Sequence, residues 1–303
     1  MKNIHHPDDV INKLIRWAEQ RDSIRAMLLT STRAVPNAPR DNLSDYDVIL
    51  VVENIHPFFE DRNWIADFGE VLVTYWDPIH LDPDHNIEKV ANVIQFEDGL
   101  KIDFTLWPVE LLGKIIQAPR LQAELDAGYR VLLDKDHLTD EMPPPTYTAY
   151  IPTRPTNEEY HKAIEDFFSD APYVAKCLLR GELLPVKWAL DYDMKHIFLR
   201  LVLEWRIEIT HDWSIPVGAL GKGLKKRLPF EIWSKLEETY AGAGIADNWK
   251  ALFKTMALFR QVATEVGEAL GYVYPQDLDE RVVAYVQQMQ SLSLDDQPTR
   301  NRT

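Results

Sequence analysis

Residues 28–52 read LLTSTRAVPNAPRDNLSDYDVILVV. This stretch predicts a strand ending at Thr30–Arg33, a loop rich in proline and asparagine, and a strongly apolar strand that opens at Asp45-Tyr46-Asp47. Alternate residues of a strand point to the same face, so Asp45 and Asp47 should project together. Two neighbouring carboxylates repel each other unless a cation lies between them, and Mg²⁺ accepts one or two carboxylates together with substrate phosphates. The stretch therefore predicts a cation site where the second strand begins.

Further strand-length segments lie on both sides of this stretch. A helix should come first, because apolar residues recur at helical spacing after Pro7-Asp8-Asp9. Glu97-Asp98-Gly99 predicts a hairpin turn, and a helix should follow Pro108. The apolar segments rich in β-branched residues are 24–29, 48–52, 71–75, 90–96 and 102–107, with a further short strand at 130–134. Residues 1–135 therefore predict a small domain with a mixed sheet.

The second half of the chain has a different pattern. Residues 136–156 contain Pro143-Pro144-Pro145 and show little periodicity, as a non-repetitive linker does. From residue 157 to 292 the apolar spacing is helical, and the polar residues 293–303 predict a disordered tail. The predicted helices are 160–168, 171–180, 185–208, 230–240, 249–270 and 278–292. The fold class predicted for the whole chain is α+β, with an all-helical second domain.

A third carboxylate stands out in the segment Gly99–Trp107. Alternation places three apolar residues on a core face and puts Asp103 on the opposite face with Lys101. Taken alone, Asp103 is typical of the wet side of a sheet, but beside the Asp45 and Asp47 pair it predicts a metal site with three carboxylates. The same tripeptide, Asp-Tyr-Asp, recurs at 191–193 inside an apparent helix. There, residues i and i+2 lie on different sides, so we interpret the second copy as a solvated helix surface.

Charge is distributed unevenly along the 303 residues. The net charge is −15, and acidic residues outnumber basic ones by 26 to 14 over residues 1–150, against 22 to 19 over the rest. A negative field repels nucleic acid and attracts metal ions and small polycations, so no nucleic-acid partner is expected. The alternative, that acidity only maintains solubility, stays open.

The cysteine content and the apolar segments indicate the cellular compartment in which the protein is expected. Cys177 is the single cysteine, which excludes an intrachain disulfide and favours a reducing compartment. The first residues contain no apolar segment typical of a secretory signal, and no apolar run approaches the roughly 20 residues needed to span a bilayer. We therefore expect a cytoplasmic protein without a membrane partner. The sequence sets no oligomeric state.

Several weaker features have ordinary interpretations. Trp188, Trp205, Trp213 and Trp233 occupy helix-like positions and are interpreted as core residues. Cys177 is interpreted as a small buried residue on a helix. The segment 80–85, HLDPDH, has metal-type ligands, but its proline and polarity predict a surface loop. The segment 218–222, GALGK, lacks the spacing of a phosphate loop and predicts a basic turn between helices.

Two motifs together resemble a known family. Residues 29–41, LTSTRAVPNAPRD, are similar to L-N-G-S-R-x-N-P-N-A-P-K-D, and residues 45–48, DYDV, follow at the family spacing. Residues 96–106, FEDGLKIDFTL, are similar to F-E-D-G-x-R-I-D-L-T-L. Weaker matches continue to 271–275, GYVYP, so the resemblance covers roughly residues 8 to 288. The chain thus resembles the aminoglycoside 6-adenylyltransferases, or streptomycin adenylyltransferases, of the nucleotidyltransferase superfamily.

This resemblance implies an N-terminal nucleotidyltransferase domain, a helical C-terminal domain and an active site in the cleft between them. It implies transfer of AMP from ATP to a hydroxyl of a cationic aminoglycoside such as streptomycin, with release of pyrophosphate. Asp45 and Asp47 would hold Mg²⁺, and Asp103 would be a further metal ligand or the base. The residues implied in nucleotide binding are Ser31, Thr32, Arg33, Lys176 and Lys222.

The chain departs from the family at one position. The superfamily has a Gly-Ser pair where Ser31-Thr32 stands here. Glycine lets the backbone approach the triphosphate, and the following hydroxyl contacts a phosphate. Thr32 can supply that hydroxyl, whereas Ser31 adds a Cβ. Ser31 therefore leaves open a catalytically weak or silent relative that binds nucleotide and acts as a regulator. A separate alternative is a nucleotidyltransferase whose acceptor is a different small molecule or a protein side chain.

Overall fold

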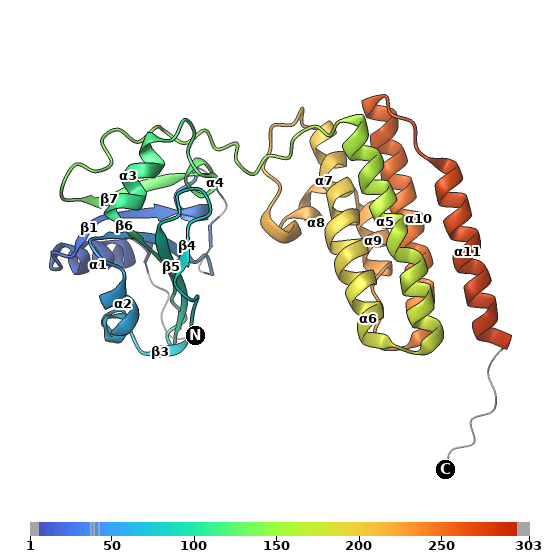
Figure 1. Ribbon diagram of the computed structural model, residues 1–303, viewed down its shortest axis with the longest axis horizontal. Helices are drawn as coiled ribbons and strands as arrows, with labels where there is room; N and C mark the ends of the chain where they lie inside the picture. Colours follow the sequence, from blue (N-terminus) through green and yellow to red (C-terminus); the bar gives the residue numbers. More distant parts are fainter. Residues whose placement is uncertain (1–5, 37, 39, 42, 296–303) are drawn as a thin grey trace, which may run out of the picture. The chain divides into compact units, whose positions relative to one another are not determined.

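The computed structural model describes residues 6–36, 38, 40–41 and 43–295 (Figure 1). The chain divides into two compact units, Met1–Tyr150 and Ile151–Thr303. This boundary falls inside the segment 136–156 that the sequence marks as a linker. The first unit combines helices with a sheet and the second is helical, so the predicted α+β class is confirmed.

The described strands of the first unit form a seven-stranded mixed sheet. Its order is β3-β5-β6-β2-β1-β7, with β4 paired to β5. The central strands β2 and β6 run parallel, whereas the other neighbours are antiparallel. The strands are β1 (Ile24–Thr30), β2 (Tyr46–Val52), β3 (Val71–Trp76), β4 (His80–Leu81), β5 (Glu88–Phe96), β6 (Lys101–Pro108) and β7 (Tyr129–Asp134). All six segments predicted as strands are present.

Helices give the sheet two buried faces. On one face, α1 (Pro7–Glu19) and α2 (His56–Glu60) pack with the 3₁₀ turn η2 (Asn63–Asp67) around Trp17 and Phe104. On the other face, α3 (Val109–Gln117) and α4 (Ala123–Asp126) cover Trp107. A short 3₁₀ turn, η1 (Ser31–Arg33), follows β1 directly. The central strands β1 and β2 are apolar on both sides because both of their faces are covered, whereas β3 is largely exposed.

The segment predicted as a linker is partly docked on the first unit. Leu138 and Met142 pack against the core beneath α3. Thr146 donates from its backbone and its hydroxyl to Asp126, at 2.9 and 2.7 Å. Residues up to Tyr150 therefore belong to the first unit, and the proline-rich composition reflects an extended but packed segment.

The second unit is a helical bundle. The helix α5 (Asn157–Arg180) begins with a capping box between Thr156 and Glu159 and contains Pro172, so the two predicted helices 160–168 and 171–180 are one. The other helices are α6 (Leu183–Lys187), the π-helix η3 (Trp188–Leu199), α7 (Arg200–Ile209), the turn η4 (Ala219–Gly221), α8 (Leu224–Arg227), α9 (Phe230–Glu238), α10 (Ile245–Leu270) and α11 (Gln276–Asp295).

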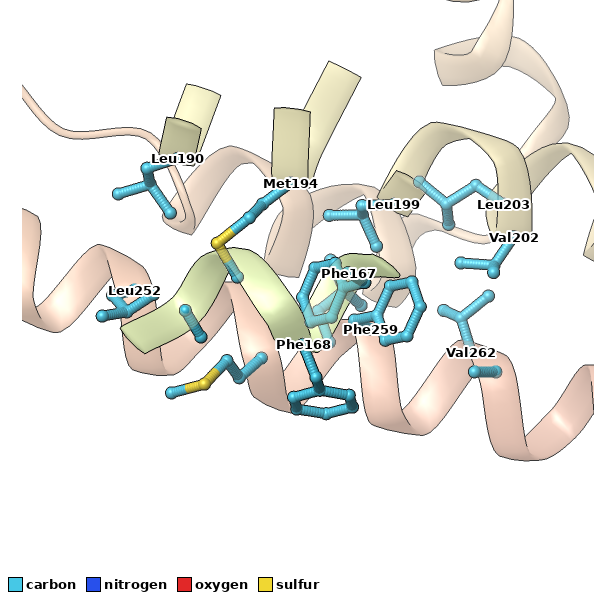
Figure 2. Close-up of a cluster of buried hydrophobic side chains, with 14 of the residues drawn as sticks. Phe167, Phe168, Leu190, Met194, Leu199, Val202, Leu203, Leu252, Phe259 and Val262 are labelled. Carbon is cyan, nitrogen blue, oxygen red and sulfur yellow. The ribbon is translucent and has the colours of Figure 1, made fainter. Parts of the chain in front are cut away.

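Aromatic packing fills the bundle core (Figure 2). The rings of Phe167 and Phe259 stack with centroids 3.6 Å apart, and Phe168 meets Phe259 edge-on. Cys177 is buried, as predicted. The last helix continues to Asp295, so the first three residues of the predicted tail are helical, while 296–303 lie outside the described residues. No helix within the described ranges is both long and apolar enough to cross a bilayer.

Candidate active site

Two of the predicted aspartates stand side by side on the central strands. The parallel register of β2 and β6 pairs Asp47 with Asp103, so both side chains project from the same face of the sheet. Asp45 lies just before β2 begins at Tyr46. This juxtaposition depends on the parallel pairing, because 56 residues separate Asp47 from Asp103 along the chain. The structure thus brings all three aspartates to one end of the two strands.

Lys101 connects two of the three carboxylates. Its Nζ donates to Asp45 Oδ2 at 2.6 Å and to Asp103 Oδ2 at 2.8 Å. Burial alone would lower the pKa of Lys101, but these two partners raise it above the usual lysine value. The sequence places Lys101 on the face of Asp103 without indicating this bridge. Lys101 is therefore a site residue that sequence reasoning missed.

The carboxylates resist ionisation in this arrangement. Burial raises the pKa of Asp47, and the charges of Asp103 and Asp45 raise it further, while a hydrogen bond from Ser31 opposes the shift. Burial likewise raises the pKa of Asp103, against the opposing effect of Lys101. Both shifts have the direction expected when like charges are crowded together away from water. One ammonium group thus leaves three carboxylates incompletely neutralised.

The donor set fits a hard divalent cation. Asp103 Oδ1 is buried and has no hydrogen-bond partner within the described residues. Carboxylate oxygens are the ligands that Mg²⁺ prefers, and a cation would supply both the missing partner and the missing charge. Across the described part of the chain, no three carboxylate, imidazole or thiol groups are already arranged around one metal position. The aspartate side chains would have to adjust to share an ion.

Ser31 occupies the turn that follows β1. Its φ is 59°, in the left-handed region where glycine is favoured and a side chain costs roughly 1–2 kcal/mol. The Ser31 side chain hydrogen-bonds Asp47, and Ser31 and Thr32 are both exposed. The backbone at Ser31 thus has the conformation that suits the glycine found at this position in the family. The serine hydroxyl, which glycine lacks, contacts the carboxylate of Asp47.

Arg33 is turned inward from the same loop. Its Nε donates to the Asp45 carbonyl at 2.9 Å, and its Nη2 donates to the Ser44 carbonyl at 2.6 Å. The guanidinium also lies 3.8 Å from the ring centroid of Tyr46, and the residue is buried. These contacts tie the end of β1 to the start of β2. Arg33 therefore holds the backbone that carries Asp45.

Glu124 on α4 is a fourth carboxylate near this face. Burial raises the pKa of Glu124, and the charges of Asp47 and Asp82 add to that shift against Lys89. In the sheet, Asp47 is paired with Thr30, and Thr30 is paired with Tyr129 at the start of β7, shortly after α4. No motif marked Glu124, since only the packing of α4 on the sheet brings it near Asp47.

The segment 80–85 is more than the predicted surface loop. Asp82 is buried, accepts from Lys89 Nζ at 2.8 Å and pairs with His85 Nδ1 at 2.8 Å. Burial alone would raise the pKa of Asp82, but the hydrogen bonds from Lys89 and His85 lower it well below its usual range. The prediction was wrong for Asp82 because local polarity does not reveal a buried carboxylate that tertiary partners neutralise.

The sequence matches one known protein family over nearly its whole length. The family model described as streptomycin adenylyltransferase matches residues 4–289. The chain belongs to this family. Aminoglycoside 6-adenylyltransferase of Bacillus subtilis (strain 168) is 31% identical over 280 residues, which cover 92% of this chain and 96% of that protein. The aminoglycoside 6-adenylyltransferase of Campylobacter jejuni is 30% identical over 281 residues, covering 92% and 93%.

A solved structure gives a further match. The crystal structure of an aminoglycoside 6-adenyltransferase from Bacillus subtilis aligns with a TM-score of 0.43 and 26% identity, covering 94% of this chain and 99% of that one. Membership of the streptomycin adenylyltransferase family confirms the resemblance read from the motifs. The protein is accordingly a nucleotidyltransferase.

Within this family member, the two predicted lysines lie in the second unit. Lys176 is exposed on α5. Lys222 is exposed in the turn between η4 and α8, where Gly221 and Gly223 have positive φ values of 80° and 86°. That turn is the basic connection between helices that the sequence predicts. Both ammonium groups are accessible to an anionic ligand.

Trp188 departs from its predicted place in the core. The side chain is 65% exposed, whereas Trp205 is buried and Trp213 and Trp233 pack partly buried against the bundle core. The interpretation was therefore wrong for Trp188, which begins the π-helix and points away from the core. Asp191 is also more than a solvated residue, because it bonds both Lys187 and the buried Lys195 at 2.6 Å.

Proposed function

We propose that this protein transfers AMP from ATP to a hydroxyl of a cationic aminoglycoside, with streptomycin as the first candidate, and releases pyrophosphate. The observation that carries the proposal is the pairing of Asp47 with Asp103 beside the Ser31-Thr32 turn. That arrangement offers carboxylates for a metal and hydroxyls for phosphates within one short region. Two relatives at about 30% identity are aminoglycoside 6-adenylyltransferases, which supports the acceptor class.

Each residue has a separate task in the proposed reaction. Asp45, Asp47 and Asp103 would hold Mg²⁺, which neutralises phosphate charge and aligns the triphosphate when it is bound. The acceptor hydroxyl oxygen forms a bond to the α-phosphorus, and the bond from that phosphorus to pyrophosphate breaks. Asp103 has an alternative role in place of metal binding: it is the candidate to accept the hydroxyl proton, because its raised pKa brings it closer to the operating pH.

Phosphate binding falls to the turn and to the second unit. Ser31 and Thr32 are exposed and offer hydroxyls, while Arg33 holds the turn through the Ser44 and Asp45 carbonyls. Lys176 and Lys222 are the proposed contacts from the helical unit to the triphosphate. The acidic excess of residues 1–150 supports a polycationic acceptor rather than a nucleic acid. The single cysteine agrees with a reaction in the reducing cytoplasm.

Pyrophosphate release tests this function. The wild-type protein is incubated with Mg-ATP and a panel of aminoglycosides, and mass spectrometry measures addition of an adenylyl group to the acceptor. We expect release with streptomycin, loss of release in Asp47→Asn, and normal release in the matched control Asp212→Asn, which changes an exposed aspartate of the second unit. No release with any aminoglycoside would contradict the proposal.

A second candidate is a nucleotide-binding relative with little transfer activity. The observation that favours it is Ser31, whose side chain occupies a left-handed position that suits glycine. Isothermal titration with Mg-ATP separates the two candidates when combined with the panel. Binding of Mg-ATP without pyrophosphate release for any aminoglycoside points to the silent relative, or to an acceptor of another chemical class.

A further inference from the structure

The outer side of the π-helix carries three stacked rings, which we call the aromatic face: Trp188, Tyr192 and His196. The first two rings have centroids 5.1 Å apart and the last two 5.7 Å apart, with an interplanar angle of 26° between Tyr192 and His196. A π-helix turns once in between four and five residues, so these side chains follow one another along one side. Trp188 and Tyr192 are 65% and 46% exposed.

This face is not needed for the bundle core. Leu190 and Met194, on the inner side of the same helix, are buried in the cluster that also contains Phe167 and Phe168 (Figure 2). Contiguous exposed apolar surface can mark an interaction site, and π-helical segments are frequent at functional sites. The aromatic face is therefore a candidate binding surface that the proposed catalytic residues do not use.

One flank of the aromatic face carries carboxylates that lack a counter-charge. Asp193 follows Trp188 by five residues, about one π-helical turn, and its charge reaches Asp170 on the neighbouring α5. Neither carboxylate forms an ion pair among the residues that the structure describes. Burial and the charges of Asp193 and Asp166 raise the pKa of Asp170 to about 6. A bound cation would remove this repulsion.

On the other flank of the aromatic face, Lys187 and Lys195 already have hydrogen-bond partners. Lys187 donates to Asp191 and to the Ala241 carbonyl, at 2.6 and 2.8 Å. Lys195 is buried and donates to Asp191 and to the Thr239 carbonyl, both at 2.6 Å. Neither ammonium group is therefore directed toward a ligand on the aromatic face, and the uncompensated charge there is negative.

We propose that the aromatic face, together with Asp193 and Asp170, binds a guanidinium group of the cationic acceptor. A guanidinium is planar and delocalised, stacks on aromatic rings and pairs with carboxylates through two parallel hydrogen bonds. The negative flank disfavours the polyanionic nucleotide. The inference rests on the proposed function, because it names where the second unit holds the acceptor of that reaction.

Isothermal titration with streptomycin, a guanidinium-bearing probe, tests the aromatic face. We expect Trp188→Leu to weaken streptomycin binding about tenfold, and Trp188→Phe to retain most of the affinity because a ring is kept. The matched control is Phe230→Leu, which removes a side chain that is 82% exposed on α9 and should leave the affinity unchanged. Asp193→Asn should weaken binding less and reduce its salt dependence.

Mg-ATP titration and steady-state kinetics complete the experiment. The Kd of Mg-ATP should stay within about twofold in Trp188→Leu, while the KM for streptomycin rises. Weaker Mg-ATP binding with unchanged streptomycin binding would make the face a nucleobase platform and overturn the inference. If Trp188→Leu releases pyrophosphate with an unchanged KM for streptomycin, the inference about the aromatic face is wrong, while the proposed adenylyl transfer stands. Wild-type protein that neither binds streptomycin nor releases pyrophosphate with it contradicts both proposals.

Discussion

The two copies of Asp-Tyr-Asp have different environments in the two units. In Asp45-Tyr46-Asp47, the tyrosine is buried beneath the Arg33 guanidinium, and the two carboxylates belong to the cluster around Lys101. In Asp191-Tyr192-Asp193, the tyrosine is exposed between two other rings, and the two carboxylates diverge. One pairs with lysines, and the other lies near Asp170.

The difference comes from the period of the secondary structure. A strand repeats every two residues, so the flanking aspartates share a face and the central tyrosine enters the core. A helix repeats every four residues or so, and flanking positions therefore separate around its axis. An identical tripeptide concentrates negative charge in one unit and divides it in the other. Four substitutions test this comparison.

The largest effect is expected for Asp47→Asn. Loss of a charged group that acts on the transition state costs roughly 2–4 kcal/mol, or about thirtyfold to a thousandfold in kcat/KM. The raised pKa of Asp47 means that protonation favours the folded state below about pH 4, and that this contribution is lost as pH rises through the folded-state value. At neutral pH without Mg²⁺, the melting temperature should therefore hold or rise.

Pyrophosphate release and thermal melting of Asp47→Asn, with and without Mg²⁺, measure these two quantities. The matched variant in the second tripeptide is Asp193→Asn, which should keep kcat close to the wild-type value while the KM for streptomycin rises modestly. Near-normal turnover of Asp47→Asn would remove this carboxylate from the mechanism.

Asp191→Asn should mainly affect stability. Lys195 is buried and its pKa is lowered by that burial, so loss of its partner leaves a charge poorly compensated. We expect a decrease in the free energy of unfolding of about 2–3 kcal/mol, below the full cost of a broken buried pair because Asp191 is partly exposed. Urea denaturation measures the change against Asp193→Asn. Equal stability of the two variants would refute this division of roles.

Lys101→Met removes the cation that joins Asp45 and Asp103. Without Mg²⁺, the free energy of unfolding should fall by about 1–2 kcal/mol, since the carboxylates lose a charged hydrogen-bond partner. Added Mg²⁺ should stabilise this variant more than the wild type, because no ammonium group competes for the oxygens. Thermal melting across a Mg²⁺ series measures both effects, and an identical Mg²⁺ response in the two proteins would exclude such competition.

The smallest effect is expected for Ser31→Gly. Glycine relieves the left-handed strain at φ 59° but adds unfolded-state entropy and loses the hydrogen bond to Asp47, so stability should change by less than about 1 kcal/mol. Mg-ATP should bind more tightly because the turn can approach the phosphates. Titration and melting of both proteins measure these quantities. Unchanged or weaker binding would show that the nucleotide already accommodates Ser31.

Much of the fold could be predicted because its signals are local. The β-branched segments, the hairpin at Glu97-Asp98-Gly99 and the helical spacing after residue 157 each depend on neighbours in sequence. The segments 160–168 and 171–180, predicted as two helices, form the single helix α5, which passes through Pro172. The docking of Leu138 and Met142 was also unpredictable, since apolar residues in a proline-rich segment do not reveal their partners.

The sequence by itself predicted that Asp45 and Asp47 lie together where a strand begins, and the motifs around them led to the correct family. Tertiary structure decided the rest of the candidate site. The Lys101 bridge, the proximity of Glu124 to Asp47 and the burial of Asp82 require strands and helices that are distant along the chain. The exposure of Trp188 likewise depends on which side of its helix meets α5. Alternation is a property of one strand, whereas charge pairing and burial are properties of the packed molecule.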